Sequence, residues 1–457
     1  MTLHNQAHAL KQQDIRHHLH PWQHFASFAA DGALLIEKGE GAYIQDVSGR
    51  QYLDAVGGIW CTNLGLGRQH MAEAISQQVR ELAYANPFSD MGSARTAELA
   101  AKLAELAPGT LNRTMFSNGG STAIDAAARL AHFYQASRGM PAKRHFISRV
   151  RAYHGSTYLS ASLSGRDHVK EFHYDAENIH FVSCPDYYRA PLGLSEDGFC
   201  DQLIDELEAK ILEIGPDKIA AFFAEPIMGS GGVIVPPADY NRRTLDLCRK
   251  YDVLYVADEV VTAFGRVGHW FASSGEFGIV PDIVTCAKGI TSGYLPLGAT
   301  LYSDEIHEVI SHGDPDRLFA HGFTYSGHPV CCAAALKVID IIEREQILDH
   351  VHDVGSYFET QLKTLEDLAI VGDVRGRRFM MCVEFVANKA TRELFPESMD
   401  IGKMVADHCQ TQGLIVRPLV HLNVMSPPLI LTRAQVDEIV ATLRAAIELT
   451  QKDLKIA

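Results

Sequence analysis

Two short apolar runs in the middle of the chain each stop at a charged residue. Residues 253–257 (Val-Leu-Tyr-Val-Ala) are followed by Asp258, and residues 282–287 (Asp-Ile-Val-Thr-Cys-Ala) are followed by Lys288. Short apolar runs that do not alternate with polar residues are typical of strands buried on both faces, as in parallel sheets. Such sheets bind their ligands outside the carboxyl ends of the strands. The sequence therefore predicts that Asp258 and Lys288 face one ligand site.

A carboxylate and an isolated lysine at strand ends suit the cofactor pyridoxal 5'-phosphate. The lysine amine can form a Schiff base, and the carboxylate keeps the pyridine nitrogen protonated so that the ring accepts electrons. A predicted strand at 114–116 leads into Ser117-Asn118-Gly119-Gly120-Ser121-Thr122 and a helix at 123–134. Free amides, hydroxyls and the helix dipole would bind a phosphate there. The same residues could equally do no more than cap the helix.

The length of 457 residues exceeds one ordinary core and predicts two domains. Strands and helices alternate from about residue 114 to 300, which predicts one large, mostly parallel sheet. Beyond about 346 the pattern indicates a smaller α+β domain, with helices at 349–367, 401–412 and 433–450 and strands at 414–417 and 420–425. The predicted boundaries give an N-terminal segment at 1–67, which joins the small domain and the active-site entrance. A large cofactor-binding domain follows at 68–330, and a linking helix with the C-terminal small domain at 331–457.

Composition excludes several classes of partner. A formal charge of −15 argues against nucleic acid, because phosphate backbones need a cationic surface. No apolar run approaches the ~20 residues of a membrane span, so no membrane partner is expected. The nine cysteines form no C-x-x-C and indicate reduced thiols. The first residues lack a basic stretch followed by an apolar one, so a cytoplasmic location is expected.

The first thirty residues are rich in histidine and glutamine. His17, His18, His20 and His24 are possible metal ligands, but no Cys, Asp or Glu is recognised at ligand spacing. A solvated segment without a metal is therefore predicted.

Taken together, these residues resemble the class III aminotransferases of the fold-type I pyridoxal phosphate enzymes, most closely the ω-amine:pyruvate transaminases. The most specific motifs are residues 254–298, which include Ala-Lys-Gly-Ile-Thr-Ser-Gly-Tyr-Leu-Pro-Leu-Gly, and residues 321–329, His-Gly-Phe-Thr-Tyr-Ser-Gly-His-Pro. The resemblance extends from about residue 19 to the C-terminal helix. It implies an α/β fold, with a large domain around a mostly parallel seven-stranded sheet and a smaller α+β domain built from both chain ends.

The resemblance also implies roles for individual residues around the cofactor. Lys288 would be the Schiff-base lysine and the acid/base of the proton shift, and Asp258 the partner of the pyridine nitrogen. The other implied cofactor-binding residues are Val260 and Tyr153 on the two ring faces, His154 beside Tyr153, Gly120 and Ser121 at the phosphate, Glu225 near the phenolic oxygen, and Thr324 lent by a neighbouring subunit. A paired, buried carboxylate is an equally acceptable interpretation of Glu225.

The implied reaction is a ping-pong transfer of an amino group from a diamine or ω-amino acid to pyruvate. Trp22, Trp60, Phe88 and Tyr153 would form the pocket walls, and Arg417 would be a mobile arginine that clamps a carboxylate and swings away for an amine. The alternative for Arg417 is an ordinary salt bridge. A shared site implies a homodimer or a dimer of dimers.

Two rival functions stay open at this point. The first is another class III reaction with the same cofactor, namely an aminomutase, racemase or decarboxylase. The second is a non-catalytic binding protein. Its support is the loop at 119–124, which reads Gly-Gly-Ser-Thr-Ala-Ile where the family commonly has Ser-Gly-Ser-Glu-Ala-Asn. The replacements put the rigidity of the loop and the affinity for the cofactor in doubt.

Overall fold

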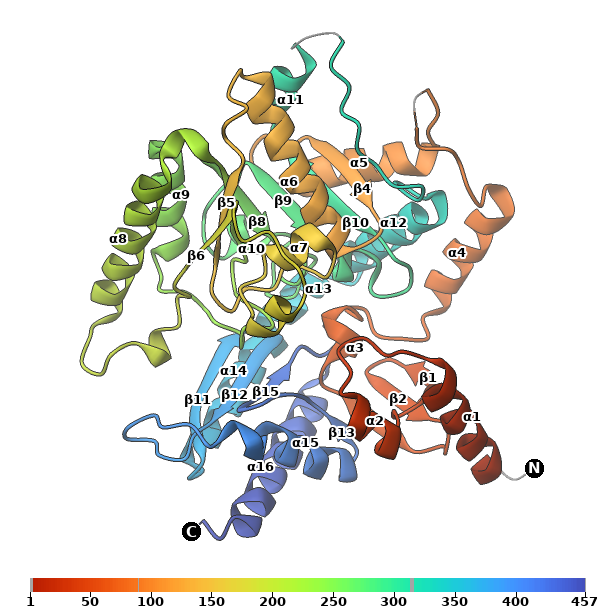
Figure 1. The fold of residues 1–457 in the computed structure, drawn as a ribbon. Helices are drawn as coiled ribbons and strands as arrows, with labels where there is room; N and C mark the ends of the chain where they lie inside the picture. The colour runs from red at the N-terminus through yellow and green to blue at the C-terminus, as the bar shows by residue number, and fades with distance from the viewer. Residues whose placement is uncertain (1–2, 89, 313–315, 457) are drawn as a thin grey trace.

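The computed structural model describes residues 3–88, 90–312 and 316–456, and its centre is a seven-stranded sheet (Figure 1). The strand order is β4-β10-β9-β8-β7-β5-β6. The bounds are β4 Arg113–Ser117, β5 His145–Arg149, β6 Ile179–Val182, β7 Ile219–Ala224, β8 Leu254–Asp258, β9 Ile283–Cys286 and β10 Gly298–Tyr302. Only β10 runs antiparallel to its neighbours within this sheet. The predicted large, mostly parallel sheet is confirmed.

Helices cover both faces of this sheet, which explains why its central strands lack alternation. In β7, consecutive Phe222 and Phe223 point to opposite faces and enter two different apolar clusters. One face carries α6 (Gly120–Ser137), α7 (Tyr158–Ser162) and α11 (Asp304–Ser311). The other carries α5 (Ala94–Leu106), α8 (Glu196–Ile214), α9 (Tyr240–Lys250) and α12 (Pro329–Arg344), and α4 (Gln69–Glu81) packs on α12.

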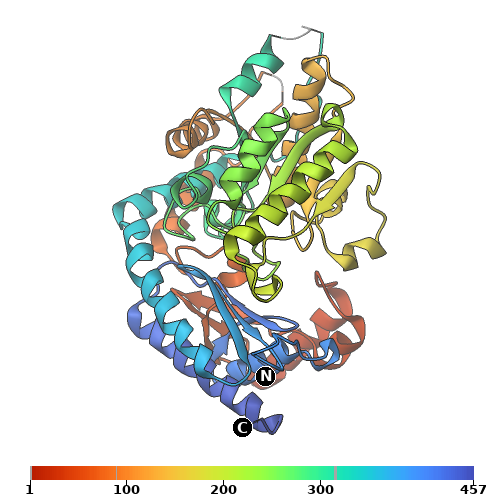
Figure 2. The ribbon, with the colours of Figure 1, turned by 90° about the vertical axis from the view of Figure 1, so that its left-hand side faces the viewer.

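The smaller domain joins the two ends of the chain (Figures 1 and 2). One of its sheets contains β1 (Ile36–Glu40), β2 (Tyr43–Asp46), β3 (Gln51–Asp54) and, parallel to β3, the C-terminal β13 (Leu414–Ile415). The second contains β11 (Val371–Arg377), β12 (Met380–Phe385), β15 (Leu422–Met425) and β14 (Arg417–Leu419). Helices α15 (Ile401–Thr411) and α16 (Arg433–Asp453) pack on each other beside them. The α+β character is confirmed, whereas the boundaries at 67/68 and 330/331 stay predictions.

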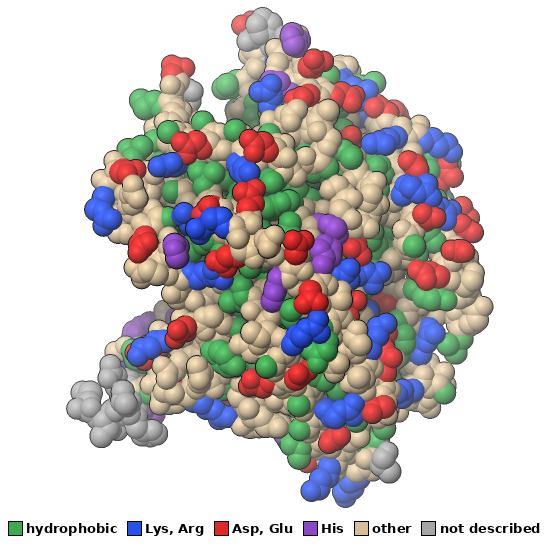
Figure 3. Space-filling view, turned by 180° about the vertical axis from the view of Figure 1, so that it is seen from behind, with side chains coloured by type: hydrophobic (Ala, Val, Ile, Leu, Met, Phe, Trp, Pro, Cys, Tyr) green, Lys and Arg blue, Asp and Glu red, His purple; other side chains and the backbone are tan. Residues whose placement is uncertain are grey.

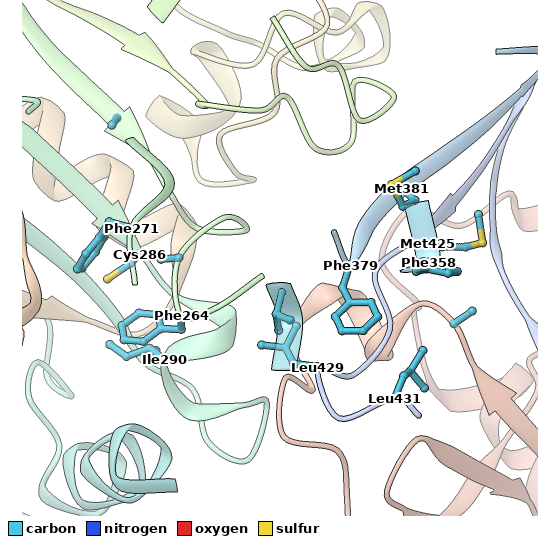
Figure 4. Packing of buried hydrophobic residues seen from close by; sticks show 14 of the residues in the cluster. Phe264, Phe271, Cys286, Ile290, Phe358, Phe379, Met381, Met425, Leu429 and Leu431 are labelled. Carbon is cyan, nitrogen blue, oxygen red and sulfur yellow. The ribbon is translucent and has the colours of Figure 1, made fainter. Parts of the chain in front are cut away.

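One apolar cluster runs through both domains. In Figure 4, Phe264, Phe271 and Ile290 of the large domain lie on one side of Leu429, and Phe358 and Phe379 of the small domain lie on the other. All of them are buried in the same cluster. The domains are therefore packed as one body, with the short helices α3 (Gly57–Trp60) and α10 (Ala272–Gly275) close to the junction.

The N-terminal segment contains α1 (Leu3–His17) and α2 (Phe25–Asp31), and none of its side chains described between residues 7 and 31 is buried, as expected of a solvated segment. Two other local expectations were wrong. The helix expected at 349–367 changes pitch, from α13 (Ile347–His350) through a π-helical turn (Val351–Gly355) to α14 (Ser356–Lys363) and a 3-10 turn (Thr364–Asp367). The strand expected at 414–417 divides at Val416, since β13 pairs with β3 and β14 pairs with β15.

Surface charge is mixed on the face shown in Figure 3, where acidic and basic side chains are interspersed. None of the described helices is both long enough and apolar enough to cross a bilayer.

Candidate active site

Asp258 and Lys288 meet at the carboxyl edge of the large sheet. The strands β8 and β9 are parallel neighbours, with Asp258 opposite Thr285. Asp258 ends β8, and Lys288 opens a 3-10 turn (Lys288–Thr291) just after β9. Both residues line a cavity of about 1360 Å³. The structure therefore brings the two residues to one cavity, and their roles at a ligand site stay predictions.

Asp258 is held in place by neighbouring polar groups. Its Oδ2 lies 2.7 Å from Nδ1 of His154, and its Oδ1 accepts a hydrogen bond from the amide of Val260 at 3.0 Å. Nε2 of His154 lies 3.2 Å from Oγ of Ser148. A proton on Nδ1 would let His154 donate to the carboxylate while Nε2 accepts from the serine. His154 thus acts on the site through Asp258, a link that the sequence did not indicate.

The adjacent carboxylate, Glu259, points away from the cavity. It is fully buried and accepts hydrogen bonds from the amides of Ala272 at 2.6 Å and Ser273 at 2.9 Å. Of the two consecutive carboxylates, only Asp258 lines the cavity.

The amine of Lys288 is available for reaction. Burial lowers the pKa of Lys288, although the charge of Asp258 acts in the opposite direction. Its Nζ lies 5.9 Å from the ring centre of Trp60, and within the described residues it has no hydrogen bond or ion pair. A lowered pKa favours the neutral amine, which is the nucleophilic and basic form.

The loop at the start of α6 lines the cavity beside this pair. The amide of Ser156 donates to Oγ of Ser121 at 3.0 Å. A Cβ atom at Gly120 would lie 2.9 Å from Cγ1 of Val260, so glycine allows the loop to approach. Oγ1 of Thr122 accepts from the amides of Asn118 and Gly119, both at 3.1 Å. Thr122, which stands where the family commonly has Glu, therefore holds the altered loop.

Glu225 and Tyr153 come together at the ends of β7 and β5. Oε1 of Glu225 accepts from the amide of Tyr153 at 3.2 Å, and Oε2 accepts from the amide of Gly229 at 2.7 Å. Burial raises the pKa of Glu225. Its carboxylate makes no ion pair with Lys or Arg in the described part of the chain, which argues against the paired-carboxylate interpretation.

Trp22, Trp60 and Arg417 line the same cavity. The Trp22 ring lies edge-on to Tyr153, with centroids 5.8 Å apart. A Cβ at Gly229 would lie 2.4 Å from the Trp60 ring, so the two segments are in close contact. Burial lowers the pKa of Arg417, whose Nε is buried without a partner. Among the described residues Arg417 forms no ion pair, and the ordinary salt bridge is therefore not observed.

The match to known proteins agrees with this geometry. Residues 27–447 match the family model of the class-III aminotransferases. The chain belongs to this family. It is 39% identical over 439 residues to a putrescine–pyruvate aminotransferase of Pseudomonas aeruginosa, covering 95% of this chain and 94% of that protein.

Solved structures give the same result. The (S)-enantioselective omega-transaminase of Thermomicrobium roseum superimposes with a TM-score of 0.94 at 40% identity, covering 97% of this chain and 99% of that one. The omega-transaminase of Pseudomonas jessenii in complex with PMP has a TM-score of 0.94 at 38% identity, covering 97% and 98%. The protein is an aminotransferase with the fold of the class III enzymes.

One cavity residue of the aminotransferase was missed. Arg166 lines the cavity, bonds Ser230 through Nη2 and keeps a buried Nε without a partner. Burial lowers its pKa, and the positive charges of Arg151 and Arg417 act in the same direction. The position of Arg166 depends on a parallel bridge between Val150 and Gly165, and no local sequence pattern predicts this bridge.

Phe88 and Thr324 do not reach the cavity of their own chain. They lie on one surface, where Oη of Tyr84 donates to the Thr324 carbonyl at 3.0 Å and a Cβ at Gly322 would lie 3.6 Å from the Phe88 ring. Phe88 is 49% exposed. The single aminotransferase chain thus does not bring Phe88 to the pocket wall as expected.

Proposed function

We propose that this aminotransferase holds pyridoxal 5'-phosphate in the large cavity and moves an amino group from a primary amine to pyruvate. Class III aminotransferases use this cofactor, and the residues present fit it. The observation that carries the proposal is the amine of Lys288, which has no bonding partner in the described part of the chain and whose pKa is lowered by burial, beside the fixed carboxylate of Asp258.

The cofactor would be held by groups already directed into the cavity. Asp258 would bind the pyridine nitrogen, Val260 and Tyr153 would cover the ring, and the amides of Gly120 and Ser121 would bind the phosphate. Glu225 would position the Tyr153 backbone rather than neutralise a charge. When bound, the cofactor supplies an electron sink for the electrons left on the donor carbon.

The protein contributes proton transfer and orientation. Nζ of Lys288 would remove the proton from the donor carbon. Its lowered pKa favours the neutral amine, which can accept a proton. Asp258 is held in a fixed orientation by its hydrogen bonds to His154 and Val260.

The proposed substrate class follows from two guanidinium groups in the cavity that form no ion pair with any described residue. Arg417 and Arg166 would bind the carboxylate of pyruvate, while Trp22, Trp60 and Tyr153 provide apolar walls for an amine with an uncharged stem. The similar protein of P. aeruginosa is named a putrescine–pyruvate aminotransferase, which supports a diamine or ω-amino acid as donor.

A homodimer would complete the site. Phe88 and Thr324 share one exposed surface and are turned away from their own cavity. A partner subunit that lends Thr324 to the phosphate would therefore bring Phe88 to the pocket as well.

We also propose that the protein is located in a reducing compartment, the cytoplasm. All nine cysteines are free thiols and seven are buried, which suits a reducing environment.

The test combines spectroscopy with product analysis. The loaded enzyme should show a visible absorption band that disappears on adding amine, and pyruvate should be converted to alanine one for one with the keto or aldehyde product. Putrescine, β-alanine, taurine and a benzylic amine form the donor panel. Lys288→Ala should lose both the band and turnover. A colourless protein in the presence of added cofactor would refute the proposal, and product without alanine would indicate an aminomutase, racemase or decarboxylase.

A further inference from the structure

A second convergent group of side chains lies outside the large cavity, at the end of α1. Asp14 lies in the last turns of this helix, His18 follows its final residue, and His20 lies two residues further on. We propose that Asp14, His18 and His20 bind a divalent transition metal ion such as Zn²⁺, and that this ion fixes the segment that carries Trp22. This segment, residues 18–24 between α1 and α2, is called the entrance strap.

The donor atoms already face one another. Oδ1 of Asp14 lies 3.1 Å from Nδ1 of His18, and Oδ2 lies 2.9 Å from Nε2 of His20. One donor atom from each residue lies within 4.8 Å of the other two. Two ligands about 2.1 Å from a tetrahedral zinc ion are about 3.4 Å apart, so side-chain shifts of about 1 Å would close the site.

The expectation that no acidic residue lies at ligand spacing from these histidines was therefore wrong. Asp14 lies four residues before His18, so the two side chains share one face of the helix and its end. His20, which lies beyond the helix, reaches the same carboxylate because the chain folds back. Periodicity could reveal the first pair, but only the tertiary structure brings in the third ligand.

The donor set selects the class of metal. Two imidazole nitrogens and one carboxylate oxygen suit Zn²⁺, Co²⁺ or Ni²⁺, whereas Mg²⁺ and Ca²⁺ prefer oxygen ligands alone. Three protein ligands leave one position for water in a tetrahedral site. The His18 side chain is 60% exposed and that of Asp14 is 12% exposed, so solvent reaches the site from the histidine side.

The His20 ligand is already oriented. Its amide donates to Oε1 of Gln23 at 2.9 Å, and its ring lies 4.7 Å from the ring of Phe28 on α2. Because these contacts hold the imidazole before a metal arrives, less side-chain entropy is lost on binding.

The site is coupled to the cavity entrance through Trp22. This residue lies two positions after His20, lines the cavity and has a backbone φ of +57°, a conformation that is unfavourable for a non-glycine residue. Its ring lies 4.8 Å from His168 and 5.8 Å from Tyr153. Cross-linking Asp14 to His18 and His20 would shorten the free chain before Trp22 and hold its ring over the entrance.

Zinc binding to the untagged, cofactor-loaded enzyme tests the site directly. After chelator treatment, calorimetric titration with ZnCl₂ should give one ion per chain. Asp14→Asn and His20→Gln should each weaken binding at least about tenfold, since loss of outer-shell partners alone costs 10–100-fold. The double variant His17→Gln/His24→Gln removes two exposed histidines of the same segment and should bind as wild type does. Absence of saturable binding, or equal weakening in this control, would overturn the proposal.

Amide hydrogen exchange tests the coupling to the strap. With zinc at about 100 times its dissociation constant, exchange of residues 18–24 should slow by up to about 100-fold in the wild type and not in Asp14→Asn. Tight binding without slower exchange in the strap would show that the ion does not fix Trp22. Neither measurement uses transamination as a readout, so the result stands apart from the function proposed above.

Discussion

Lys288 and Asp258 illustrate how burial gives two common side chains unusual properties. The lysine amine faces the cavity and has no hydrogen-bond or ion-pair partner among the residues that the structure describes. Burial lowers its pKa, whereas Asp258 is surrounded by donors. In water the lysine would be protonated at neutral pH and therefore a poor base. The same pair of residues on an open surface would form an ion pair of little consequence.

The lowered pKa of Lys288 predicts a pH dependence of stability in the cofactor-free protein. Between the lowered native pKa and the ordinary value of about 10.4, the unfolded chain binds one proton more than the native chain, so stability rises with pH. Lys288→Met should therefore be more stable than the wild type below this window, and the difference should shrink as pH rises through it. Urea unfolding at a series of pH values measures the difference. Lys363→Met, at an exposed position on α14, should show no such trend.

Arg417 should separate the two half-reactions. Arg417→Met removes a guanidinium that would bind the keto acid, so kcat/KM for pyruvate should fall about 10–100-fold, as for loss of a hydrogen bond to a charged group. The half-reaction with an uncharged-tail amine should change little, since no carboxylate is bound there. Arg417→Lys should recover only part of the loss, because an ammonium lacks the bidentate geometry. Equal losses in both half-reactions, measured by stopped-flow spectroscopy, would contradict this role.

At the scale of elements, the loop before α6 shows how an unusual sequence keeps a usual shape. Oγ1 of Thr122 accepts hydrogen bonds from two backbone amides and donates one to the Gly119 carbonyl at 2.9 Å. Ile124, which stands where the family commonly has Asn, is fully buried in the apolar cluster around α6. The substituted residues therefore serve the loop and the core.

Thr122→Ala should loosen this loop. Loss of a capping hydroxyl costs about 1 kcal/mol, which lowers the thermal midpoint of a chain of this length by about 1 °C. Cofactor affinity should fall by up to about fivefold if most of this energy is lost from binding, since 1.4 kcal/mol is tenfold. Fluorescence titration of the cofactor and calorimetry provide the two measurements. Thr122→Ser keeps the hydroxyl and should resemble the wild type.

At the scale of the molecule, the ends of the chain and the large sheet are joined by buried polar contacts as well as by the apolar cluster. Arg266 is fully buried and donates to the carbonyl of Phe379 at 3.1 Å and to Oδ1 of Asn63 at 2.7 Å. It thus connects the large domain to both the N-terminal and C-terminal parts of the small one. The cavity lies where these parts meet, with Trp60 and Arg417 contributed by the small domain's side.

A shared site predicts complementation between two inactive variants. Lys288→Ala and Thr324→Asp should each be inactive or severely impaired, the second because a carboxylate repels the phosphate. Denatured, mixed and refolded together in equal amounts, they should recover up to about a quarter of wild-type activity, since half of the dimers would be mixed and each would hold one intact site. If Thr324 acted within its own chain, the mixture would stay inactive. Co-refolded wild type provides the reference for refolding yield.

Local sequence patterns were enough to predict several strands and helices and to single out the proposed reacting groups. Buried strands, the glycine turn before α6 and the residues Asp258 and Lys288 are encoded by patterns a few residues long, because a parallel strand covered on both faces has few acceptable side chains. The resemblance extended these patterns to nearly the whole chain. The strands β4, β8 and β9 and the helix α6 accordingly lie within a few residues of their predicted bounds.

Contacts between groups far apart in the chain became visible only in the folded protein. Several features depend on contacts between segments far apart or on how the chain folds back. They are the contact of His154 with Asp258, the position of Arg166 in the cavity, the division of the strand at Val416 and the proposed third ligand His20. Such contacts leave no periodic trace, since a single hydrogen bond or ring contact constrains one residue rather than a pattern. The surface that holds Phe88 and Thr324 was decided in the same way, because a side chain turned away from its own cavity is seen only when the chain is folded.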